Sequence, residues 1–597
     1  MVSGAAIFLR TLYQAGVTHA FVNWGNDHPA FLEELERQRV ESGDKASTLI
    51  KIVTCPNEMV ALSAAHAFTL VTHKPALVIV HVDVGTQALA GAVHNADRGR
   101  APVLIFSGAS PFSGQGELKG SKNEWPMWLQ DVPDQAAIVR QYMRYTAQLQ
   151  SGRNIGKMVL RALQIATSDV KGPVYLYARR EVLDEEVDEP YANAVVDIPK
   201  WPSIQPSALT SSAVSTIIEA TRNAEFPLLI VAHSGRNPRT VPLLSELSDT
   251  LNIALHAASP SAVCVPSSHP HFLGTTFVSK NPYLARADVI IILDTEVPWV
   301  DMTSSIPRKD ARIFVIDPDP LKVTMGWSHV DAELICRGDS EAVLTQLVEA
   351  ARSLPEAMIN DLKSREHRKT LKEAHDQYIT SLRTLEDSFQ ESGIATVPNI
   401  LGVLRQAVQS HTPSKGDKTL WLNEAITNYG LVFEHLGLDR PGSILCSGGT
   451  SLGWALGGAV GALLASSTIG NEPDLAVVIV GDGTFLFGVP SSAYWIARRC
   501  NTPFLTIVLN NGGWAAPKYS MLGIYPDGHG SRASGARLST GFGPDMPDYG
   551  QIAAGAGGAW SRRTEGVQQA REAIAEGIKV VLNEKRCAVV DCIVESI

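Results

Sequence analysis

Short apolar runs recur along this chain, and each ends at turn residues before a stretch of helical character. They lie at residues 50–54, 76–82, 103–107 and 173–177, then at 227–232, 289–294 and 313–317, and finally at 419–422, 475–480 and 503–509. Uninterrupted apolar strands of this length are typical of parallel sheets that are buried on both faces, and the intervening helices provide the crossover connections. The pattern therefore predicts an α/β fold built from doubly wound parallel sheets.

The runs fall into three blocks. A chain of 597 residues is too long for one hydrophobic core. We predict an N-terminal domain over 1–185, a central domain over 208–351 and a C-terminal domain over 394–597. Residues 185–207 are acidic and contain prolines, which indicates a linker, and the charged, helical residues 354–393 indicate a second connection.

Charge and composition exclude several classes of partner. The chain carries 61 acidic and 51 basic side chains, for a net charge of −10, without a dense basic patch, which argues against nucleic acid. No apolar run approaches the roughly 20 residues that cross a bilayer. Ser3 and a predicted helix over 5–15 leave no signal-like segment, and seven cysteines without C-x-x-C spacing indicate reduced thiols. We expect a cytoplasmic protein that acts on a small molecule.

Two successive strands of the third block end in oxygen-bearing side chains. The first ends in Gly481-Asp482-Gly483 and the second in Asn510-Asn511. If the strands are adjacent, these oxygens meet in one crevice at the carboxyl edge of the sheet. Such oxygens are the hard ligands that Mg²⁺ or Ca²⁺ prefers, and flanking glycines let backbone N–H groups approach a diphosphate. The structural alternative is a turn carboxylate followed by an ordinary polar strand exit.

This pattern, G-D-G-x(26)-N-N, resembles the thiamine-diphosphate (ThDP) binding signature of the superfamily of pyruvate decarboxylase, acetolactate synthase and benzoylformate decarboxylase. The three predicted domains also resemble that superfamily's pyrimidine-binding, central and diphosphate-binding domains, so the resemblance covers nearly the whole chain. It implies ThDP and Mg²⁺ as cofactors, with Mg²⁺ held by Asp482, Asn511 and the carbonyl of Gly513. The cofactor-binding residues implied in this segment are Gly481, Asp482, Gly483, Thr484, Asn511 and Gly513.

Glu58 lies in Cys55-Pro56-Asn57-Glu58, where a predicted strand ends and a helix over 59–70 begins. In the superfamily, a glutamate at this junction hydrogen-bonds the aminopyrimidine ring and shifts it to the imino tautomer, which then removes the thiazolium proton. The resemblance implies this role for Glu58. The structural alternative is an acidic residue favoured by the dipole of the helix that follows.

Two further segments resemble segments that contact the cofactor in the superfamily. A loop of small residues precedes a helix predicted over 453–465, and the resemblance implies that Leu452 wedges beneath the cofactor. It also implies that the carbonyl of Thr450 accepts from the pyrimidine amino group. Thr427 and Asn428 follow another strand and are placed to donate to diphosphate oxygens. The alternatives are a core leucine and a helix cap.

Candidates for substrate contact come from the first block. Asn26 follows Gly25 in a loop that resembles the family's first glycine loop, where pyruvate decarboxylases carry an acid. His81, in the strand predicted over 76–82, resembles the active-site histidine of benzoylformate decarboxylase and would relay protons near neutral pH. Gln130 resembles the glutamine of the family's F-Q-E segment. For His81, a satisfied structural histidine is the alternative.

The resemblance implies a ThDP- and Mg²⁺-dependent 2-oxo acid decarboxylase or carboligase of the acetolactate synthase-like type, in which an enamine intermediate yields an aldehyde or a 2-hydroxy ketone. One alternative is a 2-hydroxyacyl-CoA lyase, for which Arg236, Arg239 and Arg308 are candidate basic residues. Another is a non-catalytic ThDP-binding regulatory subunit. FAD is a further candidate cofactor, although no G-x-G-x-x-G follows a strand of the central block. The family's shared active sites imply a homodimer or homotetramer.

Overall fold

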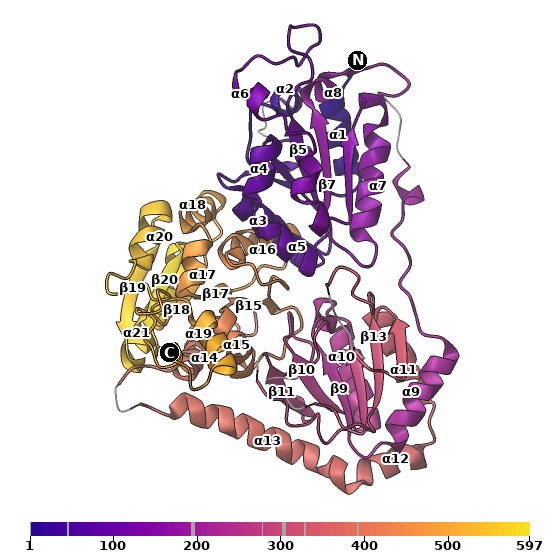
Figure 1. Cartoon of the computed structure of the whole chain (residues 1–597), viewed down its shortest axis with the longest axis vertical. Helices are drawn as coiled ribbons and strands as arrows, with labels where there is room; N and C mark the ends of the chain where they lie inside the picture. The colour runs from indigo at the N-terminus through magenta and orange to yellow at the C-terminus, as the bar shows by residue number, and fades with distance from the viewer. Residues whose placement is uncertain are drawn as a thin grey trace.

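The computed structural model describes residues 2–43, 47–192, 197–277, 279–300, 306–326, 330–390 and 393–596. Within these ranges the chain forms three six-stranded sheets, whose neighbouring strands are all parallel, and one two-stranded antiparallel ladder. Figure 1 shows the N-terminal domain at the top, the central domain at the lower right and the C-terminal domain at the lower left. The predicted α/β class with three doubly wound parallel sheets is confirmed.

The N-terminal sheet has the strand order β3-β2-β4-β5-β7-β6. Its strands are β2 (His19–Val22), β3 (Lys51–Thr54), β4 (Ala76–Val80), β5 (Val103–Ala109), β6 (Tyr145–Leu149) and β7 (Val174–Arg179). The helices of this domain are α1 (Gly4–Gln14), α2 (Pro29–Glu41), α3 (Glu58–Thr72), α4 (Val82–Ala88), α5 (Ala92–Arg98), α6 (Pro126–Leu129), α7 (Ile155–Thr167) and α8 (Arg180–Asp184). Ser3 caps α1 by accepting from the backbone N–H of Ala6.

The central sheet has the order β11-β10-β9-β12-β13-β14. Its strands are β9 (Pro227–Val231), β10 (Ala254–Ala258), β11 (Phe272–Thr276), β12 (Val289–Leu293), β13 (Arg312–Asp317) and β14 (Leu334–Arg337), and its helices are α9 (Ser211–Asn223), α10 (Thr240–Leu251) and α11 (Ser340–Arg352). The order reverses between β9 and β12, and in such sheets a crevice opens at this point beyond the carboxyl ends of the strands.

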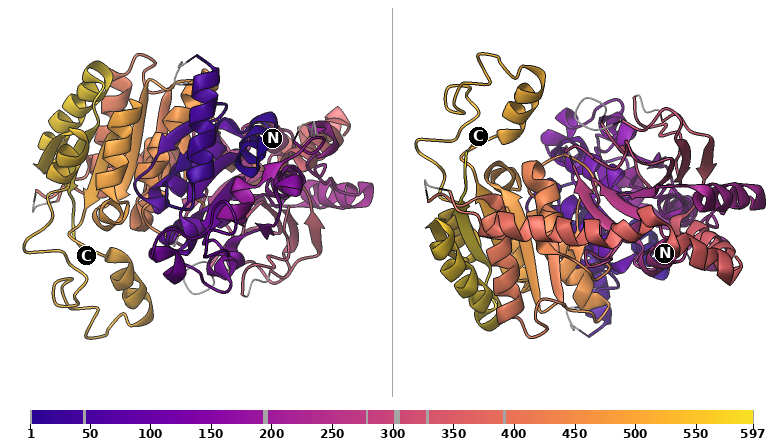
Figure 2. Two further views of the ribbon diagram at one scale, coloured as in Figure 1. Left: turned by 90° about the horizontal axis from the view of Figure 1, so that it is seen from above. Right: turned by 90° about the horizontal axis from the view of Figure 1, so that it is seen from below.

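The C-terminal sheet has the order β16-β15-β17-β18-β20-β19. Its strands are β15 (Thr419–Glu424), β16 (Ile444–Leu445), β17 (Leu475–Gly481), β18 (Leu505–Asn510), β19 (Trp560–Glu565) and β20 (Ala588–Ile593). Its helices are α14 (Val397–His411), α15 (Tyr429–Leu436), α16 (Trp454–Thr468), α17 (Asp482–Phe487), α18 (Pro490–Cys500), α19 (Ala515–Ile524), α20 (Tyr549–Gly557) and α21 (Val567–Lys579). Figure 2 shows α19 and the chain after it extending away from this sheet.

The two predicted connections differ in character. In the first, β8 (Glu186–Val187) pairs antiparallel with β1 (Val2–Ser3), and residues 193–196 lie outside the described residues. The second contains α12 (Glu356–Ser364) and α13 (Glu366–Asp387). The domain boundaries at 185, 208, 351 and 394 stay a prediction, and all three large sheets lie within them.

Helix α13 runs from the central domain to the C-terminal domain (Figure 1). Its His375 donates through Nδ1 to the carbonyl of Phe272 in β11, at 2.8 Å. Near the C-terminal end of α13, Glu386 accepts from Arg405 Nη2 at 2.6 Å and from His435 Nδ1 at 2.9 Å. The middle of the connecting helix is therefore bonded to the central domain, and its C-terminal end is bonded to the C-terminal domain.

The N-terminal and C-terminal domains share one hydrophobic core. A single buried cluster contains Phe68 and Val60 of α3 together with Trp454 and Leu456 of α16. The two helices cross closely because α16 carries glycines at the crossing: a Cβ atom on Gly461 would lie 1.9 Å from a carbonyl oxygen of α3. These two domains form one packed unit.

All seven cysteines are free thiols, five of them buried. In the part of the chain that the structure describes, we find no helix with the length and apolar character needed to cross a bilayer.

Candidate functional site

The residues predicted to bind Mg²⁺ lie at the carboxyl ends of two adjacent strands, β17 and β18. The backbone N–H of Gly513 faces two side-chain oxygens, Asp482 Oδ2 at 2.7 Å and Asn511 Oδ1 at 3.4 Å. Gly512 and Gly513 have φ values of +84° and +152°, which glycine tolerates and which allow this turn. The turn brings a carboxylate and an amide oxygen toward one point.

This donor set fits a hard divalent cation. Asp482 is buried and also accepts from the N–H of Gly483 at 2.7 Å. Burial raises the pKa of Asp482 to about 6, against the opposing effect of its backbone hydrogen bonds, and a bound cation would stabilise the ionised form. A cavity of about 30 Å³ adjoins Asn511 and Gly513. Lys518 also lines this cavity and Asp482 does not, so the assignment of the cation site depends on the donor set and not on the cavity.

The neighbouring asparagine has a different role. Asn510 donates through Nδ2 to Asp591 Oδ1 at 2.9 Å and accepts from the N–H of Gly512 at 3.1 Å. Only Asn511 of the pair therefore keeps its side chain for the crevice. A side chain is excluded at Gly483, because a Cβ atom there would lie 2.3 Å from the ring of Trp514.

Glu58 is the first residue of α3, directly after the capping residue Asn57, whose side chain accepts from the N–H of Val60. Its carboxylate oxygen Oε1 accepts from Asn23 Nδ2 at 2.9 Å. Asn23 follows β2, the neighbour of β3, so the bond joins two adjacent strand exits. The Glu58 side chain is therefore held where the C-terminal ends of the strands of the N-terminal sheet lie.

His81 lies at the same edge. The strand that contains it in our prediction ends earlier, at Val80, because Val82 turns the chain with a φ of +34°. His81 therefore stands at the cap position of α4. Its Nδ1 lies 2.5 Å from Asp27 Oδ1. Within the described residues, no hydrogen bond or ion pair joins the Glu58 and His81 group directly to Asp482.

Asn26 and Gln130 lie in loops of the same domain. Asn26 donates through Nδ2 to Glu124 Oε2 at 2.7 Å, so its side chain is engaged by the loop after β5. The main-chain carbonyl of Gln130 accepts from Ser110 Oγ at 2.7 Å. Its side-chain Oε1 is buried without a hydrogen-bond partner among the described residues. Such an acceptor is suited to a ligand donor.

The loop that carries Thr450 and Leu452 is fixed by the N-terminal domain. The N–H of Thr450 donates to His94 Nε2 at 3.2 Å, and the carbonyl of Ser451 accepts from Asn95 Nδ2 at 2.7 Å. Leu452 is partly exposed in this loop.

The remaining cofactor candidates belong to the C-terminal domain. Thr427 and Asn428 lie partly exposed in a 3-10 turn (Ile426–Asn428) after β15. Asn428 occupies the cap position of α15 without a side-chain capping bond, so its amide stays available. Thr484 is buried in α17, two residues after the predicted metal ligand Asp482.

Glu424, the last residue of β15, was missed by the sequence analysis. Its carboxylate accepts from the N–H groups of Trp454 at 2.9 Å and Ala455 at 2.7 Å, the first residues of α16. Burial raises the pKa of Glu424 to about 7, although these backbone bonds oppose the shift. Glu424 thereby fixes the helix start that follows Leu452.

Glu424→Gln should change how stability depends on pH. The folded-state pKa of about 7 lies above the ordinary value of 4.5, so the wild-type contribution is complete below pH 4.5 and falls as pH rises through 7. Between pH 5 and 8 the wild type should lose about 3 kcal/mol relative to the non-titrating variant. Denaturant unfolding of both proteins across this range measures it, and parallel curves would contradict the assignment.

Three family models match the chain in order. The N-terminal TPP binding domain of thiamine pyrophosphate enzymes matches residues 2–138, their central domain matches 214–347, and their C-terminal TPP binding domain matches 425–592. The chain belongs to the thiamine pyrophosphate enzyme family. The resemblance stated from the sequence is confirmed, and with it ThDP as the cofactor.

Relatives of this thiamine pyrophosphate enzyme have names that indicate several activities. It is 23% identical to 2-hydroxyacyl-CoA lyase 1 of Homo sapiens over 78% of this chain and 75% of the relative. It is also 23% identical to acetolactate synthase of Bacillus subtilis (strain 168), over 87% and 84%. The crystal structure of benzoylformate decarboxylase from Polynucleobacter necessarius has the same fold, with a TM-score of 0.76 and 16% identity over 100% and 99% of the two chains. This thiamine pyrophosphate enzyme therefore breaks or forms carbon–carbon bonds.

A large cavity of about 1160 Å³ lies where the three domains of this thiamine pyrophosphate enzyme meet. Arg236 and Arg239 line it, together with Arg440 of the C-terminal domain. The terminal nitrogens of Arg236 are buried without a hydrogen-bond partner in the described part of the chain. Arg308 does not line the cavity and pairs instead with Asp310 at 2.6 Å. Two of the three predicted basic residues are thus brought together.

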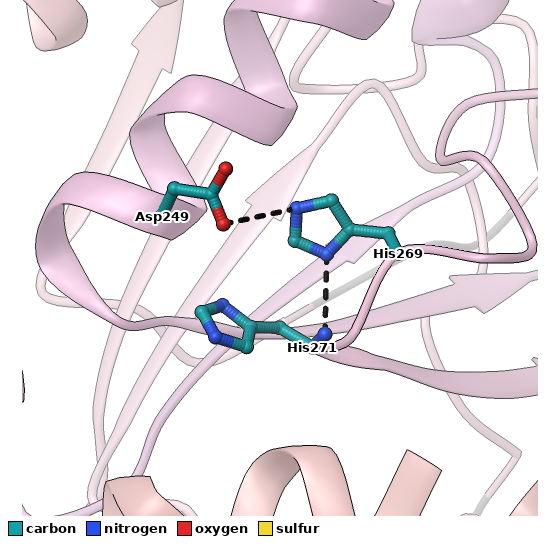
Figure 3. A group of neighbouring side chains, drawn as sticks. All are labelled: Asp249, His269 and His271. Atoms are coloured by element: carbon teal, nitrogen blue, oxygen red, sulfur yellow. Dashed lines mark hydrogen bonds and ion pairs between the residues drawn. The ribbon is translucent and has the colours of Figure 1, made fainter. Parts of the chain in front are cut away.

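A separate polar cluster in the central domain contains Asp249, His269 and His271 (Figure 3). His269 Nδ1 accepts from the backbone N–H of His271 at 3.1 Å, so its proton lies on Nε2, which points to Asp249 at 3.4 Å. A metal at Nε2 would require the opposite tautomer. The cluster is consequently arranged for hydrogen bonding within the domain.

Proposed function

We propose that this thiamine pyrophosphate enzyme decarboxylates a 2-oxo acid and releases an aldehyde or joins the acyl unit to a second carbonyl compound. The main observation that supports this proposal is the pairing of His81 with Asp27 at the sheet edge where Glu58 also lies. A positioned imidazole can supply the proton that an aldehyde product requires. Of the two product routes, this favours aldehyde release.

Each residue group has its own task in this proposal. Asp482, Asn511 and the carbonyl of Gly513 would hold Mg²⁺, and Thr427 and Asn428 would donate to the diphosphate. Bound ThDP supplies a nucleophilic carbon and an electron sink for the bond that breaks. We propose further that the active form is a homodimer or homotetramer, as the family resemblance implies.

Glu58 and His81 have separate proton tasks. Glu58, in a rotamer fixed by Asn23, would hydrogen-bond the pyrimidine ring of bound ThDP. His81 holds a proton on the substrate side. Gln130 could orient the substrate through its unpaired Oε1. Separate acid groups for cofactor and substrate let each proton move without disturbing the other.

A second candidate activity is 2-hydroxyacyl-CoA cleavage. The observation that favours it is the cavity between the domains, whose lining includes Arg236 and Arg239. The buried guanidinium of Arg236, whose terminal nitrogens have no partner among the described residues, suits a phosphate group, which it can bind in a bidentate manner. Arg239, in contrast, is exposed and pairs with Glu341 at 2.8 Å. The cavity volume is also adequate for a nucleotide-sized group.

One screen tests both candidates. Pyruvate, branched 2-oxo acids, benzoylformate and a 2-hydroxyacyl-CoA are each incubated with the enzyme, ThDP and Mg²⁺, and carbon dioxide, aldehyde and acyloin are measured. We expect carbon dioxide from at least one 2-oxo acid. Turnover of the acyl-CoA alone would replace the first proposal by the second. Failure of every substrate, together with failure to exchange the thiazolium proton, would support a regulatory subunit.

Asp482→Ala tests the assignment of the metal site, and Asp545→Ala is its control. Removing the carboxylate should abolish Mg²⁺-dependent ThDP binding, measured by calorimetry with and without EDTA. Asp545→Ala, an exposed acidic residue of the same domain, should leave that binding unchanged.

A further inference from the structure

Asp27 is a buried carboxylate between two histidines, and none of the sequence predictions includes it. It is 2% exposed. Its Oδ1 lies 2.5 Å from His81 Nδ1, and its Oδ2 accepts from the N–H of Val82 at 3.2 Å. His28 Nε2 lies 3.2 Å from the same Oδ2. Both carboxylate oxygens are therefore engaged.

The hydrogen bonds fix the tautomers of both histidines. A carboxylate only accepts, so His81 must carry a proton on Nδ1. The N–H of Gly25 donates to His28 Nδ1 at 3.0 Å, so the proton of His28 lies on Nε2, facing Asp27. The exchangeable position of His81 is consequently Nε2. The His81 side chain is 19% exposed, which leaves this atom a route to the crevice.

The charge balance agrees with this arrangement. Burial alone would lower the pKa of His81, but the hydrogen bond and charge of Asp27, with added charge from Asp83 and Glu58, raise it above its usual value. Burial lowers the pKa of His28, so that ring stays neutral. Burial would raise the pKa of Asp27, yet His28 and His81 bring it below its usual value. One carboxylate and one imidazolium thus share the buried site.

Two glycines make room for the pair. A Cβ atom on Gly25 would lie 2.0 Å from His81 Nδ1, and one on Gly108 in β5 would lie 1.8 Å from Asp27 Oδ2. Neither position can carry a larger residue while the two side chains keep their places. The same loop supplies Asn23, which orients Glu58. The loop after β2 therefore positions groups on both sides of the predicted reaction centre.

We propose that Asp27 is a positioning residue that holds the proton of His81 on Nδ1, so that the second proton of the imidazolium form, on Nε2, is the general acid of the proposed decarboxylation. In that step the Nε2–H bond breaks and a C–H bond forms at the carbon that has lost carbon dioxide. His81 is left neutral and regains a proton from water. The step rests on the proposed function and requires no other reactant. The charged groups that face His81 are Asp27, Asp83 and Glu58, with His28 behind them.

The first test uses the enzyme without substrate. In protein labelled with ¹⁵N-histidine, the signals of His81, identified by their loss in His81→Gln, report both its tautomer and its pKa. We expect the Nδ1–H tautomer in the wild type and a lower pKa in Asp27→Asn. A wild-type Nε2–H tautomer would overturn the proposal even if the variant does not fold.

The second test follows activity. A general acid must be protonated, so the rate falls on the alkaline side as pH rises through its pKa. Asp27→Asn should move this alkaline limb of kcat to lower pH and reduce kcat by about 10- to 100-fold, with less change in KM. Asp83→Asn is the matched control, because this buried neighbour makes no hydrogen bond to His81. The alkaline limb of kcat should move less in Asp83→Asn than in Asp27→Asn.

The two tests separate two kinds of failure. The pH profile is measured on whichever carbon–carbon cleavage the substrate screen detects. If the histidine signals behave as expected but no 2-oxo acid reacts, the proposed function fails while the pairing stands. If the alkaline limb is the same in the wild type and in Asp27→Asn, the positioning role is refuted.

Discussion

Glu58→Gln should retain ThDP and lose most turnover. The amide oxygen of glutamine can still accept from Asn23 Nδ2, the bond that orients Glu58, so the side chain should keep its place. What it lacks is a transferable proton, and such a loss typically costs a factor of about 10² to 10⁴ in rate. Steady-state kinetics measures kcat, and calorimetric titration measures ThDP affinity.

Glu33→Gln provides the matched control. Glu33 is exposed on α2 of the same domain, so the same change of charge there should leave both kcat and ThDP binding at wild-type values. Unaltered turnover in Glu58→Gln would refute the assigned role. Loss of ThDP binding would indicate that Glu58 holds the cofactor rather than activating it.

Gly461→Ala should separate the two helices that join the N-terminal and C-terminal domains. The added methyl group would lie 1.9 Å from the carbonyl oxygen of Ala64, a distance at which backbone must move. Because α3 and α16 contribute to one buried cluster, the displacement opens gaps in the core of both domains. We expect destabilisation by at least about 1–3 kcal/mol and a lower Tm, measured by calorimetry.

Gly555→Ala controls for helix propensity. Gly555 lies exposed in α20 with no atom within 4 Å of an added Cβ, so alanine there should be neutral or slightly stabilising. Equal Tm values for the two variants would mean that the contact at Gly461 relaxes without cost.

The central strands could be predicted from the sequence because strands buried on both faces consist of uninterrupted apolar residues. β4, β9, β12 and β17 are almost entirely apolar, and their positions were expected within two residues. β6 (Tyr145–Leu149) was not expected, since it lies at a sheet edge with polar, half-exposed side chains. Inside the sheets, β10 and β20 were also missed, because His256 and Asp591 interrupt their apolar pattern.

The residues of the candidate site were likewise predicted only in part. The predicted Mg²⁺ ligands could be found from the sequence because they directly follow β17 and β18, and the end of a strand can be recognised from neighbouring residues alone. Asp27 and Glu424 could not be read in this way, because their partners, His81 and the start of α16, lie far away in the chain. A signal for Glu424 was present: a carboxylate at a strand exit has few partners other than backbone N–H groups. For Asp27, the adjacent histidine in the loop after β2 was the available signal.

The helix that connects the central and C-terminal domains couples them mechanically. Its 22 residues span about 33 Å. His375, near its middle, is bonded to the central domain, and Glu386, near its C-terminal end, is bonded to the C-terminal domain. His435, bonded to Glu386, belongs to α15, which begins directly after Asn428. A shift of the central sheet would therefore be transmitted to the segment that carries Thr427 and Asn428.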